Sequence, residues 1–498
     1  MKEERDDSYG HVLKYTGIFG GVQGLNILVS IIRNKVVALL LGPAGMGLAS
    51  LFQTTVNFIS QTTNLGISFS AVRNVSELFD TGDEARISHF IKVVRAWSLL
   101  TGLVGMLICA MIGPVLNSLT FSWGDHTLHF VVLSPLVAML AVTGGETAIL
   151  KGARQLRSLA AIQVYNMLLS LIIILPLYYF FGLSGIVPVL VLIGLTTMLL
   201  TLRCSYRLYP LQLTGAKGIL GEGMGMVRLG VAFTLAGVLG SGADFVIRSY
   251  LNNVAGLEIV GLYNTGYVMT MTYAGLVFSA METDFFPRLS AVNTDWRSCN
   301  EIVNKQIEVS LLLISPMLQL AQFVLPYIIP LLFSDEFMPV VDMMRLLLLA
   351  LYLRAVKLPI AYLPLAKGDS LSYLFLESVY DIAAVFLVMW GYQLWGLTGT
   401  GVAITLNALM DYFLIVGYAS YKYHYRMARS VVGFQLLHLS LGALAFVVAA
   451  FTEGWQWWTG GVVLFVMCLG ATLYTLHRKV ALWNKLLSNF KQRFSRHG

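Results

Sequence analysis

The side chains most able to do chemistry in this sequence are charged residues inside long apolar segments. A charge at the centre of a bilayer costs about 2.5–3.5 kcal/mol on insertion scales, so each one calls for a reason. Four basic residues lie well inside such segments: Arg33, Arg248, Arg354 and Lys357. They suit an anionic, phosphate-bearing group, because the planar guanidinium of arginine can hold two phosphate oxygens at once. The alternatives are that the first two reach the membrane surface and that the last two belong to buried ion pairs.

Acidic residues inside apolar segments form the second group: Glu146, Asp244, Glu377, Asp381 and Asp411. Asp244 precedes Arg248 by one helical turn, so the spacing predicts a local ion pair. Glu146 is either a carboxylate facing a cavity or a partner of Lys151. The remaining three either pair with the basic residues or include one that titrates and couples a transport cycle to an ion gradient.

Uncharged amides recur at spacings of four, four and three residues: Gln53, Asn57, Gln61 and Asn64. These spacings place them along one stripe of a helix. Such groups suit sugar hydroxyls, and they equally suit hydrogen bonds between helices. Arg73 and Arg288 occupy matching places at the ends of their segments. There they form a gate that receives an anionic headgroup, or they anchor the topology.

The elements that must position these residues are transmembrane helices. Hydrophobic residues make up 57% of the 498 residues and charged residues only 12%, whereas a soluble protein carries about 25% charged residues. The apolar segments are long enough to cross the ~30 Å core of a bilayer as helices. We therefore predict an all-α polytopic membrane protein with about fourteen spans, near residues 13–41, 46–72, 88–113, 127–150, 157–181, 184–205, 226–252, 257–283, 305–332, 339–366, 370–392, 396–420, 430–451 and 457–476.

The basic residues sort to alternate connections between these spans. One set of connections contains Lys and Arg throughout, and the other set carries Asp and Glu instead. The positive-inside rule then places both termini in the cytoplasm. This asymmetry accounts for the net charge of +7, so we expect no nucleic-acid partner.

The sequence offers no motif for catalysis or for a cofactor. It contains no GK[ST] phosphate loop, no GxSxG and no HExxH, and its four cysteines have no CxxC spacing. We expect no metal, no cofactor and no enzymatic activity.

Short motifs return at a spacing of about 215 residues. The four matches are Gly182-Leu-Ser-Gly185 with Gly396-Leu-Thr-Gly399, Lys151-Gly152 with Lys367-Gly368, Gly47-Leu48 with Gly261-Leu262, and Arg73 with Arg288. Their constant order predicts two six-helix lobes in the same orientation, with a substrate path at the seam between them.

The predicted domains follow from this repeat. They are an N-terminal lobe (1–210), a cytoplasmic linker (211–223), a second lobe that repeats the first (224–425), two additional spans (426–477) and a basic amphipathic tail (478–498). The tail combines lysines with an apolar face, so we expect it to lie on the anionic membrane surface.

The segment from Leu41 to Ala49, Leu-Gly-Pro-Ala-Gly-Met-Gly-Leu-Ala, is the most specific motif of the chain. With the second span through Gly66-Ile67-Ser68, it resembles the Wzx-type flippases of the multidrug/oligosaccharidyl-lipid/polysaccharide exporter superfamily. The resemblance implies a V-shaped pair of lobes that flips an undecaprenyl-pyrophosphate-linked oligosaccharide by alternating access, for O-antigen-like or other lipopolysaccharide assembly. Wzx-type members usually have twelve spans, so the two additional spans depart from their pattern.

Three other functions remain open as alternatives. A multidrug cation antiporter of the same superfamily would need a cavity rich in carboxylates, and a lipid II flippase would differ only in the sugar. A glycan polymerase or ligase would need a large periplasmic loop that the sequence lacks. The expected partners are the lipid-linked substrate, membrane lipids and other membrane proteins of polysaccharide assembly.

Overall fold

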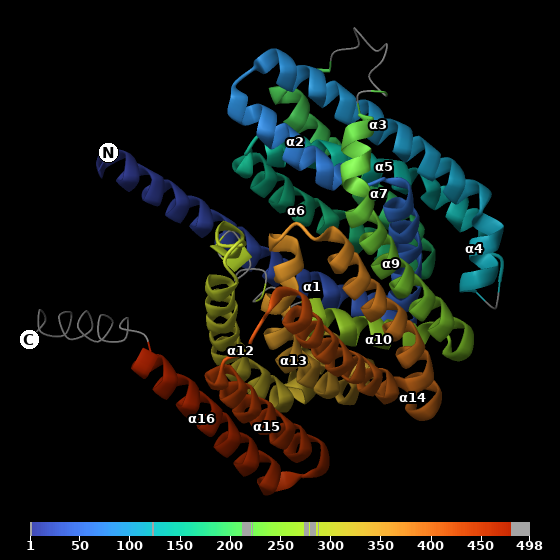
Figure 1. Cartoon of the computed structure of the whole chain (residues 1–498). Coiled ribbons are helices and arrows are strands. Elements are labelled where there is room, and N and C mark those ends of the chain that lie inside the picture. Colours follow the sequence, from blue (N-terminus) through green and yellow to red (C-terminus); the bar gives the residue numbers. More distant parts are fainter. Residues whose placement is uncertain are drawn as a thin grey trace, which may run out of the picture. The chain divides into compact units, whose positions relative to one another are not determined.

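The fold is helical throughout the part of the chain that the structure describes (Figure 1). This computed structural model describes residues 2–121, 124–211, 221, 223–272, 278, 285–286 and 288–479. Most of the predicted linker (211–223) and of the basic tail (478–498) lies outside these residues.

Nine helical stretches among the described residues are long and apolar enough to cross a membrane. Two of them, Arg157–Leu208 and Ser370–Tyr423, contain 52 and 54 residues. Each is therefore long enough for two crossings, because one crossing needs about 20 residues. The prediction of an all-helical polytopic membrane protein is confirmed, and the number of fourteen spans stays a prediction.

The chain divides into two compact units, and the first comprises Met1–Asn264, Pro330–Phe337 and Glu377–Val385. Its elements are α1 (Lys2–Thr63), α2 (Ile67–Thr81), α3 (Glu84–Met111), α4 (Gly113–Thr120), α5 (Thr127–Gly152), α6 (Leu156–Phe181), η1 (Gly182–Gly185), α7 (Ile186–Leu208), α9 (Met224–Ala255), most of α10 (Leu257–Tyr267), and η3 (Asp335–Phe337).

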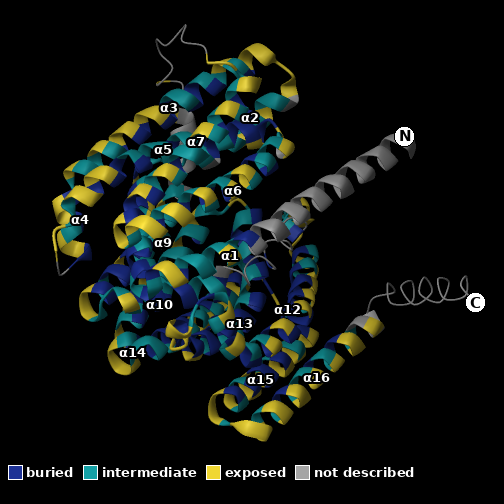
Figure 2. Cartoon of the chain, turned by 180° about the vertical axis from the view of Figure 1, so that it is seen from behind, coloured by how far each residue is buried: buried dark blue, intermediate teal, exposed yellow. Residues whose placement is uncertain are grey.

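The core of the first unit lies where α2, α3 and α5 pack together. Ile67, Ile91 and Ile149 are almost fully buried there, one from each helix. Figure 2 shows the buried faces of these helices turned toward one another and their exposed faces turned outward. Burial of such side chains stabilises the unit by about 1.5–3 kcal/mol each where the reference is water.

The second unit comprises Thr265–Ile329, Met338–Leu376 and Phe386–Gly498. Its elements are η2 (Val268–Thr272), most of α12 (Trp296–Leu332), α13 (Val340–Ala366), most of α14 (Ser370–Tyr423), α15 (Arg429–Phe451) and α16 (Gly454–Lys479). Helix α13 is the most buried candidate span, and its Tyr352 packs on Gly442 of α15. Helices α15 and α16 form a hairpin, visible in Figure 1.

Two long helices bend at glycines. Helix α1 is interrupted at Gly42, whose φ of 63° precedes Pro43, and α14 is interrupted at Gly396, whose φ is 57°. Gly182, which the repeat pairs with Gly396, has a φ of 53° at the end of α6. Only glycine adopts this backbone region at little cost. The first glycine of the repeated Gly-Leu-Ser/Thr-Gly motif thus has a positive φ in each half of the sequence.

Candidate functional site

Arg248 lies in a closed polar cluster of the first unit. Its guanidinium bonds Asp244 Oδ1 at 2.8 Å through Nη1 and donates to Ser50 Oγ and Asn264 Oδ1 at 3.1 and 3.2 Å. The residue is 3% exposed. The i, i+4 ion pair that the spacing predicts is present, and the alternative that Arg248 reaches the membrane surface is wrong. The hydrogen-bond donors of the guanidinium are thus already engaged by other side chains of the protein.

The amide stripe lies on the part of α1 that follows the bend. Gln53 Nε2 donates to Asn57 Oδ1 at 2.9 Å, and Asn64 Nδ2 donates to Ser68 Oγ at 2.8 Å. Asn57 and Gln61 are exposed although they belong to a candidate membrane span. An exposed amide in a span needs polar surroundings, because an unpaired amide in hydrocarbon costs several kcal/mol.

A line of glycines on α9 faces these polar groups within the first unit. A Cβ at Gly237 would lie 3.6 Å from Oε1 of Gln61, and a Cβ at Gly240 would lie 3.5 Å from Oδ2 of Asp381. Asp381 and Glu377 are both half-buried. The first unit therefore gathers amide and carboxylate side chains along one side of α9.

Glu146 is held by a residue that sequence reasoning missed. Arg95 of α3 bonds its carboxylate through Nε at 2.8 Å and Nη2 at 3.3 Å, and Ser205 Oγ of α7 donates to Oε2 at 2.5 Å. The Arg95 guanidinium also lies 4.3 Å from the centre of the Tyr206 ring. Glu146 is 2% exposed. The predicted partner, Lys151, is exposed instead.

Lys357 and Asp411 form a buried ion pair in the second unit. Lys357 Nζ lies 2.6 Å from Asp411 Oδ2, and the aspartate side chain is 2% exposed. Arg354, one helical turn earlier, is half-buried. It lies 3.9 Å from the sulfur of Met271 and over the ring of Phe278. Among the described residues, no carboxylate comes within ion-pair distance of Arg354.

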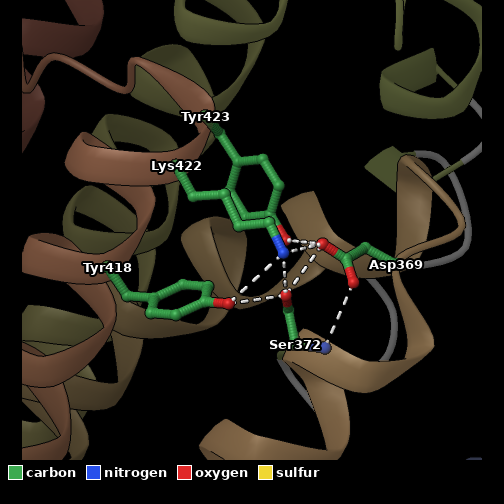
Figure 3. A network of polar contacts seen from close by, with 5 residues as sticks. All are labelled: Asp369, Ser372, Tyr418, Lys422 and Tyr423. Carbon is green, nitrogen blue, oxygen red and sulfur yellow. Dashed lines mark hydrogen bonds and ion pairs between the residues drawn. The ribbon is translucent and has the colours of Figure 1, made fainter.

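A second polar network in this unit joins the start of α14 to its end (Figure 3). Lys422 Nζ lies 2.6 Å from Asp369 Oδ2, which also accepts hydrogen bonds from Ser372 Oγ at 2.7 Å and Tyr423 Oη at 2.8 Å. Tyr418 Oη contacts Ser372 Oγ at 2.6 Å. Partial desolvation raises the pKa of Asp369, but these hydrogen bonds outweigh it and hold that pKa below its usual range. Sequence reasoning missed this network.

The remaining predicted cations differ in their surroundings. Arg33 is half-buried and forms no salt bridge with a carboxylate of the described part of the chain. Lys35, two residues after Arg33, donates to the carbonyl groups of Pro330, in the last turn of α12, and of Phe333, directly after it, and so caps that end of the helix. Arg73 pairs with Glu77 at 2.8 Å on an exposed surface, and Arg288 is exposed.

A family model described as "Polysaccharide biosynthesis protein" matches residues 36–342, well over half of the chain. The chain belongs to the polysaccharide biosynthesis protein family. The match includes the bend of α1, the amide stripe, the Arg248 cluster and the Arg95–Glu146 pair. It ends just before Arg354, Lys357 and the additional helices α15 and α16. No curated protein matches the chain.

Solved transporters share the fold of this polysaccharide biosynthesis protein. An inward-facing multidrug resistance transporter of the MATE family is 15% identical and covers 80% of this chain and 94% of its own, with a TM-score of 0.66. The lipid II flippase MurJ is 12% identical and covers 93% and 99%, with a TM-score of 0.69. A transporter of the MOP superfamily from Pyrococcus furiosus is 16% identical and covers 82% of this chain and 93% of its own, with a TM-score of 0.57. These identities establish a common fold and no more.

Proposed function

We propose that this polysaccharide biosynthesis protein is a flippase for an undecaprenyl-pyrophosphate-linked oligosaccharide. It carries its substrate from the cytoplasmic to the periplasmic leaflet of the inner membrane by alternating access. The product then enters the assembly of a cell-surface polysaccharide of the O-antigen type. Family membership supports the pathway class, and the shared transporter fold supports the mode of action.

The observation that carries the proposal is the exposed amide stripe. Asn57 and Gln61 are exposed on a helix that is otherwise apolar enough to span a membrane. Neutral donors and acceptors at this depth suit a water-filled path lined for sugar hydroxyls. A purely apolar cargo would gain nothing from them.

The pyrophosphate needs a cation whose charge is not already neutralised. Arg248 is paired with Asp244 and Lys357 with Asp411, so carboxylates of the protein already neutralise most of their charge. Taking each unit by itself, we assign headgroup contacts to Arg33 in the first unit, with Arg248 in a supporting role, and to Arg354 in the second unit, with Lys357 in a supporting role. Arg73 and Arg288 serve at the cytoplasmic entrance.

A carboxylate that couples transport to an ion gradient must be able to exchange a proton with water, so it should be neither fully buried nor held in a buried ion pair. Glu146 and Asp411 are buried against Arg95 and Lys357, and Asp244 is bonded to Arg248. Glu377 and Asp381 are half-buried and are the better candidates. The same pairing disfavours a multidrug cation antiporter, because a cationic drug would have to displace a bonded arginine or lysine.

The experiment compares Arg354→Gln with Arg86→Gln in proteoliposomes that contain a labelled undecaprenyl-pyrophosphate oligosaccharide. Arg86 is an exposed cation at the start of α3 and serves as the matched control. Loss of a charge-assisted hydrogen bond of about 1.5–3 kcal/mol should slow flipping roughly tenfold or more for Arg354→Gln. The control should flip at the wild-type rate. Equal rates for both variants would show that Arg354 does not bind the headgroup. Faster flipping of lipid II than of the oligosaccharide would show that lipid II is the preferred substrate.

A further inference from the structure

The hairpin of α15 and α16 leaves a cavity against α12 and α13 in the second unit. Its polar part has a volume of about 720 Å³ and is lined by Arg345, Tyr327, Glu453, Gln456, Trp457 and Trp458, among others. Volumes of about 300–1,000 Å³ are usual for ligand sites. None of these residues takes part in the flipping site proposed above.

Arg345 lines this cavity, and the hydrogen bonding of its guanidinium is incomplete. The residue is 8% exposed, and its Nη1 lies 3.3 Å from Oδ1 of Asp342. Its Nε is buried and has no hydrogen-bond partner among the described residues. A buried donor without a partner costs about 1–3 kcal/mol, so an anionic ligand that draws the guanidinium toward the cavity and accepts its hydrogen bonds would offset this cost.

An apolar groove continues from the polar cavity along α12 and α16. It has a volume of about 150 Å³, and Leu320, Phe323, Val462 and Phe465 line it. Tyr327, Trp457 and Trp458 line both the groove and the polar cavity. Tyrosine and tryptophan are enriched where a membrane protein meets the headgroup region. The two parts thus form one site with a polar head and an apolar tail.

Glu453 determines which class of lipid headgroup the polar cavity can bind. It lies in the short turn between α15 and α16 and lines the same polar cavity as Arg345. A guanidinium and a carboxylate in one cavity match a ligand that carries both a phosphate and an amine. An anionic lipid without an amine would be repelled by Glu453.

We propose that this cavity binds one aminophospholipid of the phosphatidylethanolamine class. The lipid phosphate accepts a hydrogen bond from Arg345, its ammonium group pairs with Glu453, and one acyl chain lies in the groove. The lipid joins the hairpin to α12, an attachment that chains without α15 and α16 would not have. The inference is independent of the oligosaccharide substrate.

The test counts lipids on the purified full-length chain by native mass spectrometry after addition of phosphatidylethanolamine or phosphatidylglycerol. The wild type should retain one phosphatidylethanolamine, at least tenfold more readily than phosphatidylglycerol. Glu453→Gln, a change in an exposed turn, should abolish that preference. Equal retention of both lipids by the wild type, or preference for phosphatidylglycerol, would overturn the proposal.

A pair of neighbouring valines provides the matched control for the groove. Val462 lines it and is 58% exposed, whereas Val463 does not line it and is 55% exposed. Val462→Trp should fill the groove and lose the bound lipid, and Val463→Trp should retain it. Both positions are exposed, so thermal unfolding of each variant should match the wild type. Equal lipid retention by the two folded variants would rule out the groove as the lipid site.

Discussion

The buried charges of this polysaccharide biosynthesis protein are distributed in small local clusters. Arg248 has Asp244, Ser50 and Asn264, while Glu146 has Arg95 and Ser205. Each cluster satisfies charges that would otherwise be costly in a membrane. Structural roles and functional roles can therefore be separated: an ion pair that is fully bonded stabilises its unit, and an unpaired cation is available to a substrate.

Breaking the buried Arg95–Glu146 pair should destabilise the protein much more than breaking an exposed pair. Glu146→Gln leaves a buried guanidinium without its counter-charge, which typically costs about 3–5 kcal/mol. We expect a large fall in the apparent melting temperature in detergent.

The exposed Arg73–Glu77 pair is the control, because such pairs contribute only about 0–1 kcal/mol. Glu77→Gln should leave the melting temperature nearly unchanged. The double change Arg95→Met/Glu146→Gln should recover part of the loss, because no unpaired charge remains. Similar melting temperatures for Glu146→Gln and Glu77→Gln would contradict this account.

The Asp369 network predicts a pH-dependent stability. The pKa of Asp369 is lower in the folded chain than the usual value, so its contribution is complete above pH ~4 and is lost as the pH falls through the folded pKa. Asp369→Asn should lower the melting temperature at pH 7. The difference from wild type should shrink as the pH is lowered below about 4. A difference that stays constant down to pH 3 would show that Asp369 acts only as an uncharged helix cap.

Sequence reasoning predicted the ion pair whose two residues are close together in the chain. The pair of Asp244 and Arg248 follows from their spacing on one helix. The pair of Arg95 and Glu146 does not, because it depends on how α3 packs on α5, which no local pattern encodes. Arg95 could have been flagged as another charge in a span, but its partner could not have been named.

At the scale of elements, close helix crossings depend on glycine. Gly47 of α1 and Gly261 of α10 face each other, and a Cβ on either would overlap the backbone of the other helix. The repeat in the sequence pairs these same two glycines. The motif is therefore explained by packing: each small residue lets two helix backbones approach closely.

Substitution of a glycine at this helix crossing should be strongly destabilising. Gly47→Ala places a methyl group against backbone atoms that cannot move aside, and overpacking of this kind costs typically 1–3 kcal/mol or more. Gly417→Ala is the control, because nothing lies within 4 Å of its Cβ position. The control should be neutral or more stable by up to ~1 kcal/mol, since alanine favours a helix. The measurement is the melting temperature of each variant. Equal melting temperatures for Gly47→Ala and Gly417→Ala would refute the packing role.

The bends were less accessible to sequence reasoning than the crossings. The recurrence of Gly182 and Gly396 predicts equivalent places in two lobes, and both have positive φ values in the structure. The bend of α1 at Gly42 lies inside the most specific motif, yet the motif alone does not say that one helix continues on both sides. Helix continuity depends on tertiary packing, which propensity does not describe.

At the scale of the whole molecule, the helical polytopic fold was predictable because composition and apolar segment length determine it. The grouping of helices was not, because it depends on long-range contacts. Helix α9 belongs to the first compact unit although the predicted second lobe begins at residue 224. The lobes, the span number and the orientation therefore stay predictions.

Orientation has a direct test. In a background with Cys204→Ser, which removes the one native cysteine that is not buried, Asp335→Cys and Thr81→Cys each introduce an exposed thiol. The distribution of basic residues places Asp335 outside and Thr81 inside. A membrane-impermeant maleimide should label Asp335→Cys in intact spheroplasts and Thr81→Cys only after permeabilisation. The reverse pattern would invert the topology.

The measurement that tests the central claim most directly is the leaflet transfer of a labelled undecaprenyl-pyrophosphate oligosaccharide by the wild-type chain in proteoliposomes. We expect protein-dependent transfer that exceeds the rate in protein-free vesicles and that is not matched by lipid II or by an organic cation. No transfer of the oligosaccharide, together with uptake of organic cations against a gradient, would contradict the account.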